Sequence, residues 1–243
     1  PPSRAPSAPA PARSPAGPAY TRGLTTTPQG EGVSSKSMEM KVPPIPNPAA
    51  LGLGAFALTT FVLSTHNAGW APNLTWVGLA FFYGGLAQFT AGMWEFKTGN
   101  TFGATAFSTY GAFWMSLATF VVLLLAGKVP VADELTDLGW FLLAFAIFNT
   151  YMMLWSMRLN MATFLVFLTL EVTEILLFIG FFGKNTTMIQ WGGYVGVITA
   201  FVAWYASAAV VANSMRARPI LPVGNPIWLE PAAMAPAPQS HVG

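Results

Sequence analysis

Two glutamates, Glu171 and Glu174, lie within the apolar segment of residues 161–182. Their spacing of three residues places both carboxyl groups on one face of a helix, with Glu171 about 15 Å from its start. A carboxyl group at that depth in a bilayer is costly unless it faces a bundle interior or carries a proton. The pair therefore indicates either a protonatable site on a translocation path or an interhelical hydrogen-bonding pair. The partners that could serve the second alternative are Asn149, Tyr151 and Thr173.

Basic side chains do not accompany this pair along its own helix. Arg158 precedes Glu171 by about 20 Å of helical rise, and Lys184 follows Glu174 by about 15 Å. A charged or hydrogen-bonding partner for either carboxyl group must therefore come from another helix.

Gln88 and Glu95 are further polar residues in or at the end of an apolar segment. The amide of Gln88 needs partners in hydrocarbon, either another helix or a passing polar solute. Glu95 is either an interfacial anchor or part of a polar site. The chain contains no cysteine and His66 stands alone near a segment end, so no metal site and no cofactor are predicted. Nucleotide-loop, nucleophile-elbow and zinc signatures are also missing from the sequence, so we do not expect an enzyme.

Six apolar segments are the elements that must position these residues. The chain of 243 residues is 53% hydrophobic and 8% charged, whereas a soluble domain is about 25% charged. A helix of about 20 apolar residues crosses a hydrocarbon core of about 30 Å. We therefore predict an all-α membrane protein, with six transmembrane helices around a narrow central path in a domain of residues 47–214. The predicted spans are residues 48–66, 75–96, 104–126, 137–157, 161–182 and 190–214.

Two tails flank this domain. Residues 1–46 hold 11 of the 20 prolines, which predicts a disordered tail, either cytoplasmic or a remnant of an organelle transit peptide. Residues 215–243 are predicted to form a cytoplasmic tail. Placing the amino terminus in the cytoplasm puts nine of the eleven Lys and Arg residues on that side, so both termini are expected there. The net charge of +2 gives no reason to expect a nucleic-acid partner.

The start of the first apolar segment carries a recognisable motif. Residues 47–53 read Asn-Pro-Ala-Ala-Leu-Gly-Leu, in which Asn47 can cap a helix and Pro48 suits its first position. This motif resembles the signature of the acetate uptake transporter family, also called the succinate–acetate permease or Gpr1/Fun34/YaaH family. Residues 82–88, 91–97, 99–103, 106–114 and 219–224 resemble further blocks of that family, in the same order.

The resemblance implies a channel-like carrier of acetate, and sometimes of succinate or lactate, that moves with protons and is assembled as a hexamer. It places an apolar constriction at Phe56, Tyr110 and Leu170, with Gln88 near the path. These three residues lie about 12, 9 and 14 Å from the starts of their spans, so they can form one ring. The signature residues would shape the cytoplasmic vestibule; they are Asn47, Pro48, Leu51, Gly52 and Leu53.

Two features depart from the family pattern. Ala50 replaces a second proline, and Glu171 and Glu174 lie in a span that is usually neutral. With Asn149 and Glu95, the two glutamates form our candidate proton or polar site. We therefore expect a proton-linked transporter of small carboxylates, in the plasma membrane or alternatively in an organelle membrane. The alternatives are a channel for ammonium or small neutral solutes and a membrane sensor that transports nothing.

Overall fold

Helices make up the regular secondary structure of residues 45–228, the part of the chain that the computed structural model describes. Five helical segments in this part are long and apolar enough to cross a membrane. They are α1 (Ala49–Asn67), α4 (Thr101–Leu125), α5 (Glu134–Ser156) with the short 3₁₀ turn η2 (Val131–Asp133) before it, α6 (Met161–Phe182) and α7 (Thr186–Ser214). Their bounds lie within a few residues of five predicted spans, and α6 coincides with the predicted range 161–182.

The predicted span 75–96 is divided into three consecutive helical pieces. These are α2 (Trp76–Phe81), the π-helical turn η1 (Phe82–Ala87) and α3 (Gln88–Thr98), with no residue between them. Two glycines in η1 lie close to neighbouring atoms. A Cβ at Gly84 would stand 2.7 Å from Thr59 Oγ1, and one at Gly85 would meet the carbonyl oxygen of Ala80. Since a π turn adds one residue to a helical repeat, it sets which face of α3 turns toward the bundle.

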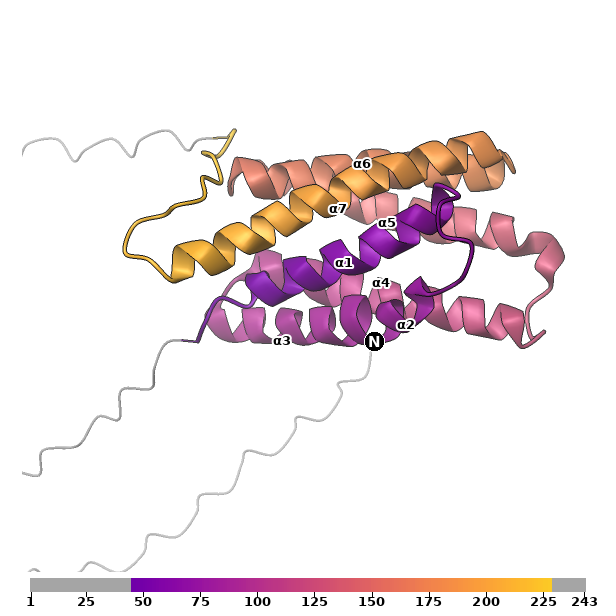
Figure 1. The fold of residues 1–243 in the computed structure, drawn as a ribbon, viewed down its shortest axis with the longest axis horizontal. Helices are drawn as coiled ribbons and strands as arrows, with labels where there is room; N and C mark the ends of the chain where they lie inside the picture. The colour runs from indigo at the N-terminus through magenta and orange to yellow at the C-terminus, as the bar shows by residue number, and fades with distance from the viewer. Residues whose placement is uncertain (1–44, 229–243) are drawn as a thin grey trace, which may run out of the picture. The chain divides into compact units, whose positions relative to one another are not determined.

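The helices lie side by side as a bundle (Figure 1). Helix α1 packs along α7, α7 along α6, α6 along α5, and α3 along α4. Fully buried alanines let the helix backbones approach closely, as is usual in lipid, where close packing rather than the hydrophobic effect drives helix association. Large apolar side chains such as Phe82, Ile147 and Phe201 are exposed on the outside, as lipid-facing positions require.

The two predicted tails fall largely outside the described residues, which leave out 1–44 and 229–243. Residues 215–228 are described, and they fold back along the ends of the helices. Asn213 Oδ1 accepts hydrogen bonds from the N–H groups of Ile220 and Leu221 at 2.8 and 3.0 Å. The N–H of Ala162 donates to Val223 O at 2.9 Å. This part of the carboxyl-terminal segment is therefore tied to α6 and α7.

Glycines of α7 make its close contact with α1. A Cβ at Gly193 would meet the backbone nitrogen of Ala68 and stand 2.8 Å from the carbonyl carbon of Asn67. A Cβ at Gly196 would meet Ser64 Oγ, and one at Gly192 would lie 2.6 Å from Leu177 Cδ2. The small face of the last span therefore serves contacts within this chain.

Gly193→Ala should destabilise the protein because the added methyl group meets backbone atoms of α1, which cannot move aside as a side chain would. We expect a loss of about 1–3 kcal/mol in the free energy of unfolding, measured by denaturant titration in detergent. Gly78→Ala is the matched control, because a Cβ there has nothing within 4 Å. It should leave stability unchanged or raise it by about 0.4–1 kcal/mol. Equal effects of the two substitutions would contradict the close α1–α7 contact.

Candidate functional site

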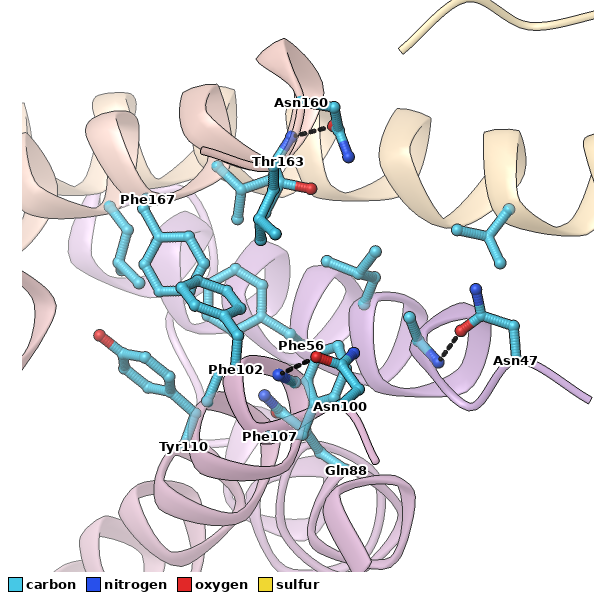
Figure 2. A pocket seen from close by; sticks show the side chains of 18 residues that line it. Asn47, Phe56, Gln88, Asn100, Phe102, Phe107, Tyr110, Asn160, Thr163 and Phe167 are labelled. Carbon is cyan, nitrogen blue, oxygen red and sulfur yellow. Dashed lines mark hydrogen bonds between the residues drawn. The ribbon is translucent and has the colours of Figure 1, made fainter. Parts of the chain in front are cut away.

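A cavity of about 250 Å³ opens between the amino-terminal ends of α1, α4 and α6, and we call it the amino-end cavity (Figure 2). Residues from α3 and α7 complete its wall. All three predicted constriction residues and Gln88 line it. The structure thus brings together side chains that are up to 114 positions apart, from Phe56 to Leu170.

Three asparagines stand at the mouth of this cavity, one at the start of each helix. Asn47 Oδ1 accepts the N–H of Ala49 at 3.0 Å, and Asn100 Oδ1 accepts the N–H of Gly103 at 3.0 Å. Asn160 Oδ1 likewise accepts the N–H of Thr163 at 2.9 Å. The amino end of a helix carries a partial positive charge of about half an elementary unit. Three such ends converge here, so the cavity mouth favours an anion.

Some of the signature residues line the amino-end cavity, and the others start α1, pack against its neighbours or are exposed. Helix α1 begins at Ala49, one residue later than predicted, so Pro48 takes the cap position and Asn47 bonds from just outside. Asn47 and Leu53 line the amino-end cavity. A Cβ at Gly52 would stand 2.7 Å from the ring of Phe107, so the glycine admits that ring against α1. Leu51 is exposed and does not line the cavity.

Gln88 is the polar residue of the amino-end cavity that lies deepest in the protein. It is 1% exposed, and its Oε1 has no hydrogen-bond partner among the described residues. A buried amide without a partner is unfavourable unless a solute or water completes its hydrogen bonds. Gln88 thus lines the same cavity as the three predicted ring residues.

Of the two alternatives for Glu95, the interfacial anchor does not fit the structure, because the side chain is buried and hydrogen-bonded within the protein. The residue is 1% exposed, and its Oε2 accepts hydrogen bonds from Asn100 Nδ2 at 2.9 Å and Thr98 Oγ1 at 3.2 Å. The carboxyl group turns inward because α3 ends here in a tight turn, with Gly99 at a φ of 78°. Glu95 therefore holds Asn100, the asparagine that caps α4.

A second cavity, of about 400 Å³, lies toward the carboxyl-terminal end of α1 and is called the carboxyl-end cavity. His66 and Asn67 mark this end of α1, and side chains from α2, α4, α5, α6 and α7 complete the lining. The linings of the two cavities come close to each other in the middle of the bundle. On α1 the lining changes from Phe56 to Thr60, and on α6 from Leu170 to Thr173 and Glu174. Each change spans about one helical turn, or about 5 Å.

The predicted ring occupies this boundary. Phe56, Tyr110 and Leu170 are all buried, and the rings of Phe56 and Tyr110 meet edge to face with centroids 5.9 Å apart. Aromatic residues of α5 support Tyr110, with the Phe148 ring centroid at 5.5 Å. All three side chains line the amino-end cavity and none of them lines the carboxyl-end cavity, so they lie between the two linings, and we call them the partition.

Behind Tyr110 lies a buried polar network centred on Asn149 of α5. Asn149 Nδ2 donates to Phe167 O at 2.9 Å and to Glu171 Oε2 at 2.7 Å. The hydroxyl of Tyr110 lies 3.0 Å from Asn149 Oδ1 and 3.4 Å from Glu174 Oε1. Thr150 Oγ1 lies 2.7 Å from Glu171 Oε1. The network joins α4, α5 and α6 without any basic side chain.

The predicted partners of the glutamates are partly correct. Asn149 donates a hydrogen bond to Glu171, as predicted under the alternative of an interhelical hydrogen-bonding pair. Tyr151 is instead exposed, and Thr173 bonds the carbonyl of Thr169 at 2.9 Å and Thr199 Oγ1 at 3.2 Å. Thr150, which the sequence did not single out as a partner, takes their place. Within residues 45–228 no group of three or more His, Asp or Glu side chains is arranged to hold a metal ion.

Comparison with known proteins places these features in context. Residues 30–224 match the model of the GPR1/FUN34/yaaH family. Acetate permease A of Emericella nidulans is 42% identical over 203 residues, covering 75% of this chain and 67% of the permease. The succinate-acetate/proton symporter SatP of Escherichia coli K12 is 38% identical over 181 residues, covering 73% of this chain and 95% of SatP.

A solved structure shares the fold as well as the sequence. The bacterial acetate channel SatP superposes with a TM-score of 0.72 at 36% identity, covering 74% of this chain and all of that one. The relatives are named as a permease, a symporter and a channel. Together with five helices that can cross a membrane, they identify an integral, multi-pass membrane protein.

Tyr110→Phe removes one hydroxyl and keeps the ring of the partition. Asn149 Oδ1 then loses its donor in a buried place, so we expect a loss of about 1–3 kcal/mol in the free energy of unfolding in detergent. Tyr194→Phe is the control, since its hydroxyl makes no hydrogen bond within the described residues, and it should change stability by less than about 0.5 kcal/mol. If Tyr110→Phe is as neutral as this control, the network does not hold the helices together.

Proposed function

The chain belongs to the GPR1/FUN34/yaaH family, and we propose that it carries acetate and related short carboxylates across a membrane together with protons. The observation that best supports this function is the pair of cavities whose linings lie on either side of Phe56, Tyr110 and Leu170. A partition about one helical turn thick is a barrier that a small solute can cross by displacing side chains.

The chemistry of the amino-end cavity favours carboxylates over ammonium. Three helix amino ends attract an anion and repel a cation, because the partial charge at each is positive. The amide of Gln88 supplies a polar group at the inner end, where a carboxylate leaves part of its hydration behind. The names of the fungal permease and the bacterial channel agree with this choice of solute.

The arrangement in the membrane is part of the same proposal. The one predicted span that is not a single long helix is the second in chain order. We assign it to the continuous run of α2, η1 and α3, residues 76–98, whose 23 residues suffice to cross the core. The distribution of Lys and Arg places both termini in the cytoplasm, with the amino-end cavity facing that side. The exposed apolar side chains of the helices suit a homo-oligomer, a hexamer by family resemblance, in the plasma membrane.

Proton linkage is assigned to the polar network of Tyr110, Asn149, Glu171 and Glu174. Its two carboxyl groups are buried without a basic partner, and an ionised carboxylate in that position is strongly disfavoured. Glu95, by contrast, is assigned a positioning role through Asn100, which caps α4 at the cavity mouth.

Transport is tested with purified protein in lipid vesicles and labelled acetate. Undissociated acetic acid crosses lipid unaided, so initial rates are corrected with vesicles that lack protein. We expect protein-dependent uptake of acetate that unlabelled short carboxylates inhibit and that an inward proton gradient accelerates. A sensor would give no protein-dependent flux, and a neutral-solute or ammonium channel would show no preference for carboxylates. Either result would contradict the proposal.

Phe56→Ala should widen the choice of solute because it removes one wall of the partition. One methylene group in an apolar pocket changes discrimination by about tenfold or more, so the uptake ratio of butyrate to acetate should rise by at least about that factor. The matched control is Phe201→Ala, which removes an exposed phenyl ring from α7. An unchanged ratio in the Phe56 variant would show that the partition does not select by size.

A further inference from the structure

Four of the residues that line the carboxyl-end cavity each carry a buried polar atom with no hydrogen-bond partner among the described residues. These atoms are Thr60 Oγ1, Trp76 Nε1, Trp114 Nε1 and Glu174 Oε2. More than about nine in ten buried polar groups have a partner, so four exceptions around one cavity call for an explanation. Two of them are indole N–H groups, which can only donate, and one is a carboxyl oxygen. Such a set suits a guest that both accepts and donates hydrogen bonds.

A count of the hydrogens available for hydrogen bonds shows that Glu174 is the residue of the polar network whose hydrogen bonds are incomplete. Both amide hydrogens of Asn149 are used, by Phe167 O and Glu171 Oε2, so Asn149 Oδ1 must accept from Tyr110. A phenol has one hydrogen, and this bond takes it. The contact of 3.4 Å between Tyr110 and Glu174 Oε1 is then a hydrogen bond only if Glu174 carries a proton and donates it.

Glu171 differs from Glu174 in its surroundings. Asn149 donates to one oxygen of Glu171 at 2.7 Å, and Thr150 Oγ1 lies 2.7 Å from the other oxygen and 2.9 Å from Ala146 O. Since a hydroxyl has one hydrogen, either Thr150 donates to Glu171, or Thr150 donates to Ala146 and a protonated Glu171 donates to Thr150. Both oxygens of Glu171 have a partner in either case.

Glu174 is 2% exposed and has the single contact with Tyr110; its second oxygen has no partner among the described residues, and the residue lines the carboxyl-end cavity. Glu171 is therefore a satisfied structural group, and Glu174 is the one that a guest can reach.

The charges around Glu174 forbid a second bare anion beside it. On α6 its titratable neighbour is Glu171, and on α4 it is Tyr110; the α5 groups are Tyr151 and, at the cavity mouth, Glu134. On α1 the titratable group of the cavity is His66, and the lining includes no Lys or Arg. A carboxylate can enter this site only if a proton lies between it and Glu174, because two ionised carboxylates at close range are disfavoured.

We propose that the carboxyl-end cavity holds a binding site for a short monocarboxylate, in which Glu174 shares its proton with the solute. Trp76 and Trp114 donate their indole N–H groups to the solute carboxylate, and protonated Glu174 donates its O–H to the same group. The proton passes to the solute oxygen, the undissociated acid leaves, and Glu174 is left ionised. A proton from the aqueous side from which the carboxylate entered then restores Glu174, so one proton crosses with each carboxylate and no net charge moves.

The rest of the lining defines the class of solute. Leu117, Leu142 and Leu177 face the cavity beyond the polar atoms. A second carboxylate would lie among these side chains without a partner, at a large desolvation cost. The site therefore fits acetate or another short monocarboxylate better than a dicarboxylate.

This inference rests on the proposed transport function, and the test separates the two. Protein-dependent uptake of labelled acetate is measured in vesicles with and without an inside-positive potential of about 60 mV, which biases one elementary charge about tenfold. Wild-type uptake should not respond to the potential, because acid transfer moves no charge. Glu174→Gln cannot supply the proton, so its acetate uptake should become electrogenic and rise severalfold with the potential. Asp137→Asn, at an exposed carboxylate of α5, should behave as wild type.

The outcomes are distinct. If the wild type shows no protein-dependent uptake, the transport proposal itself is contradicted. Wild-type uptake that follows the potential, or a Glu174→Gln variant that remains insensitive to it, overturns the proton-sharing site.

A second pair of variants decides the case if Glu174→Gln fails to fold or transport. Trp114→Phe and Trp76→Phe keep an aromatic ring and lose one donor each. Each should raise the half-saturating acetate concentration about tenfold, as expected for one hydrogen bond to a charged group. Trp140→Phe, at an exposed indole of α5, should leave it unchanged. Half-saturation at the wild-type concentration in both cavity variants would mean that water alone occupies the site.

Discussion

The arrangement of this protein depends on the burial of two carboxyl groups in an apolar bundle that offers them no basic side chain. Asn149 reduces this cost, because its amide group donates a hydrogen bond to Glu171 and its oxygen accepts the hydrogen bond of the Tyr110 hydroxyl. The same residue ties α5 to α4 and α6 at mid-height of the bundle. The requirement for hydrogen bonds in a medium without water thus places Tyr110, a ring residue of the partition, and Glu174, which faces the next cavity, on two sides of one network.

The direction of the helices determines the electrostatic character of the amino-end cavity. The helices α1, α4 and α6 start beside the amino-end cavity, so their positive ends converge where a carboxylate would enter. In the path that we propose, a carboxylate that leaves water there meets Gln88 and then the apolar partition. Beyond the partition the lining changes in character, since Glu174 and two indole N–H groups replace helix ends. Attraction of the anion and addition of its proton are therefore separated along the path.

Much of this arrangement could be predicted from the sequence, for identifiable reasons. The span 161–182 was correct at both ends because Asn160 caps it and apolar residues fill it. The π-helical turn at 82–87 could not be predicted, since it depends on how Gly84 and Gly85 meet Thr59 and Ala80 in three dimensions. The sequence left Glu95 between two alternatives for a similar reason, because position near a span end says nothing about a partner such as Asn100. Asn100 and Asn160 were missed as site residues, although an asparagine just before an apolar helix is a readable capping signal.

The central claim is that two cavities open to opposite sides of the membrane and meet only at the partition of Phe56, Tyr110 and Leu170. Since the chain has no cysteine, single cysteines can report it directly. Thr163→Cys places a thiol in the amino-end cavity and Leu63→Cys places one in the carboxyl-end cavity. With a membrane-impermeant thiol reagent applied to one side at a time, the first should react only from the side of the amino terminus. The second should react only from the other side. Labelling of both thiols from one side would contradict the account.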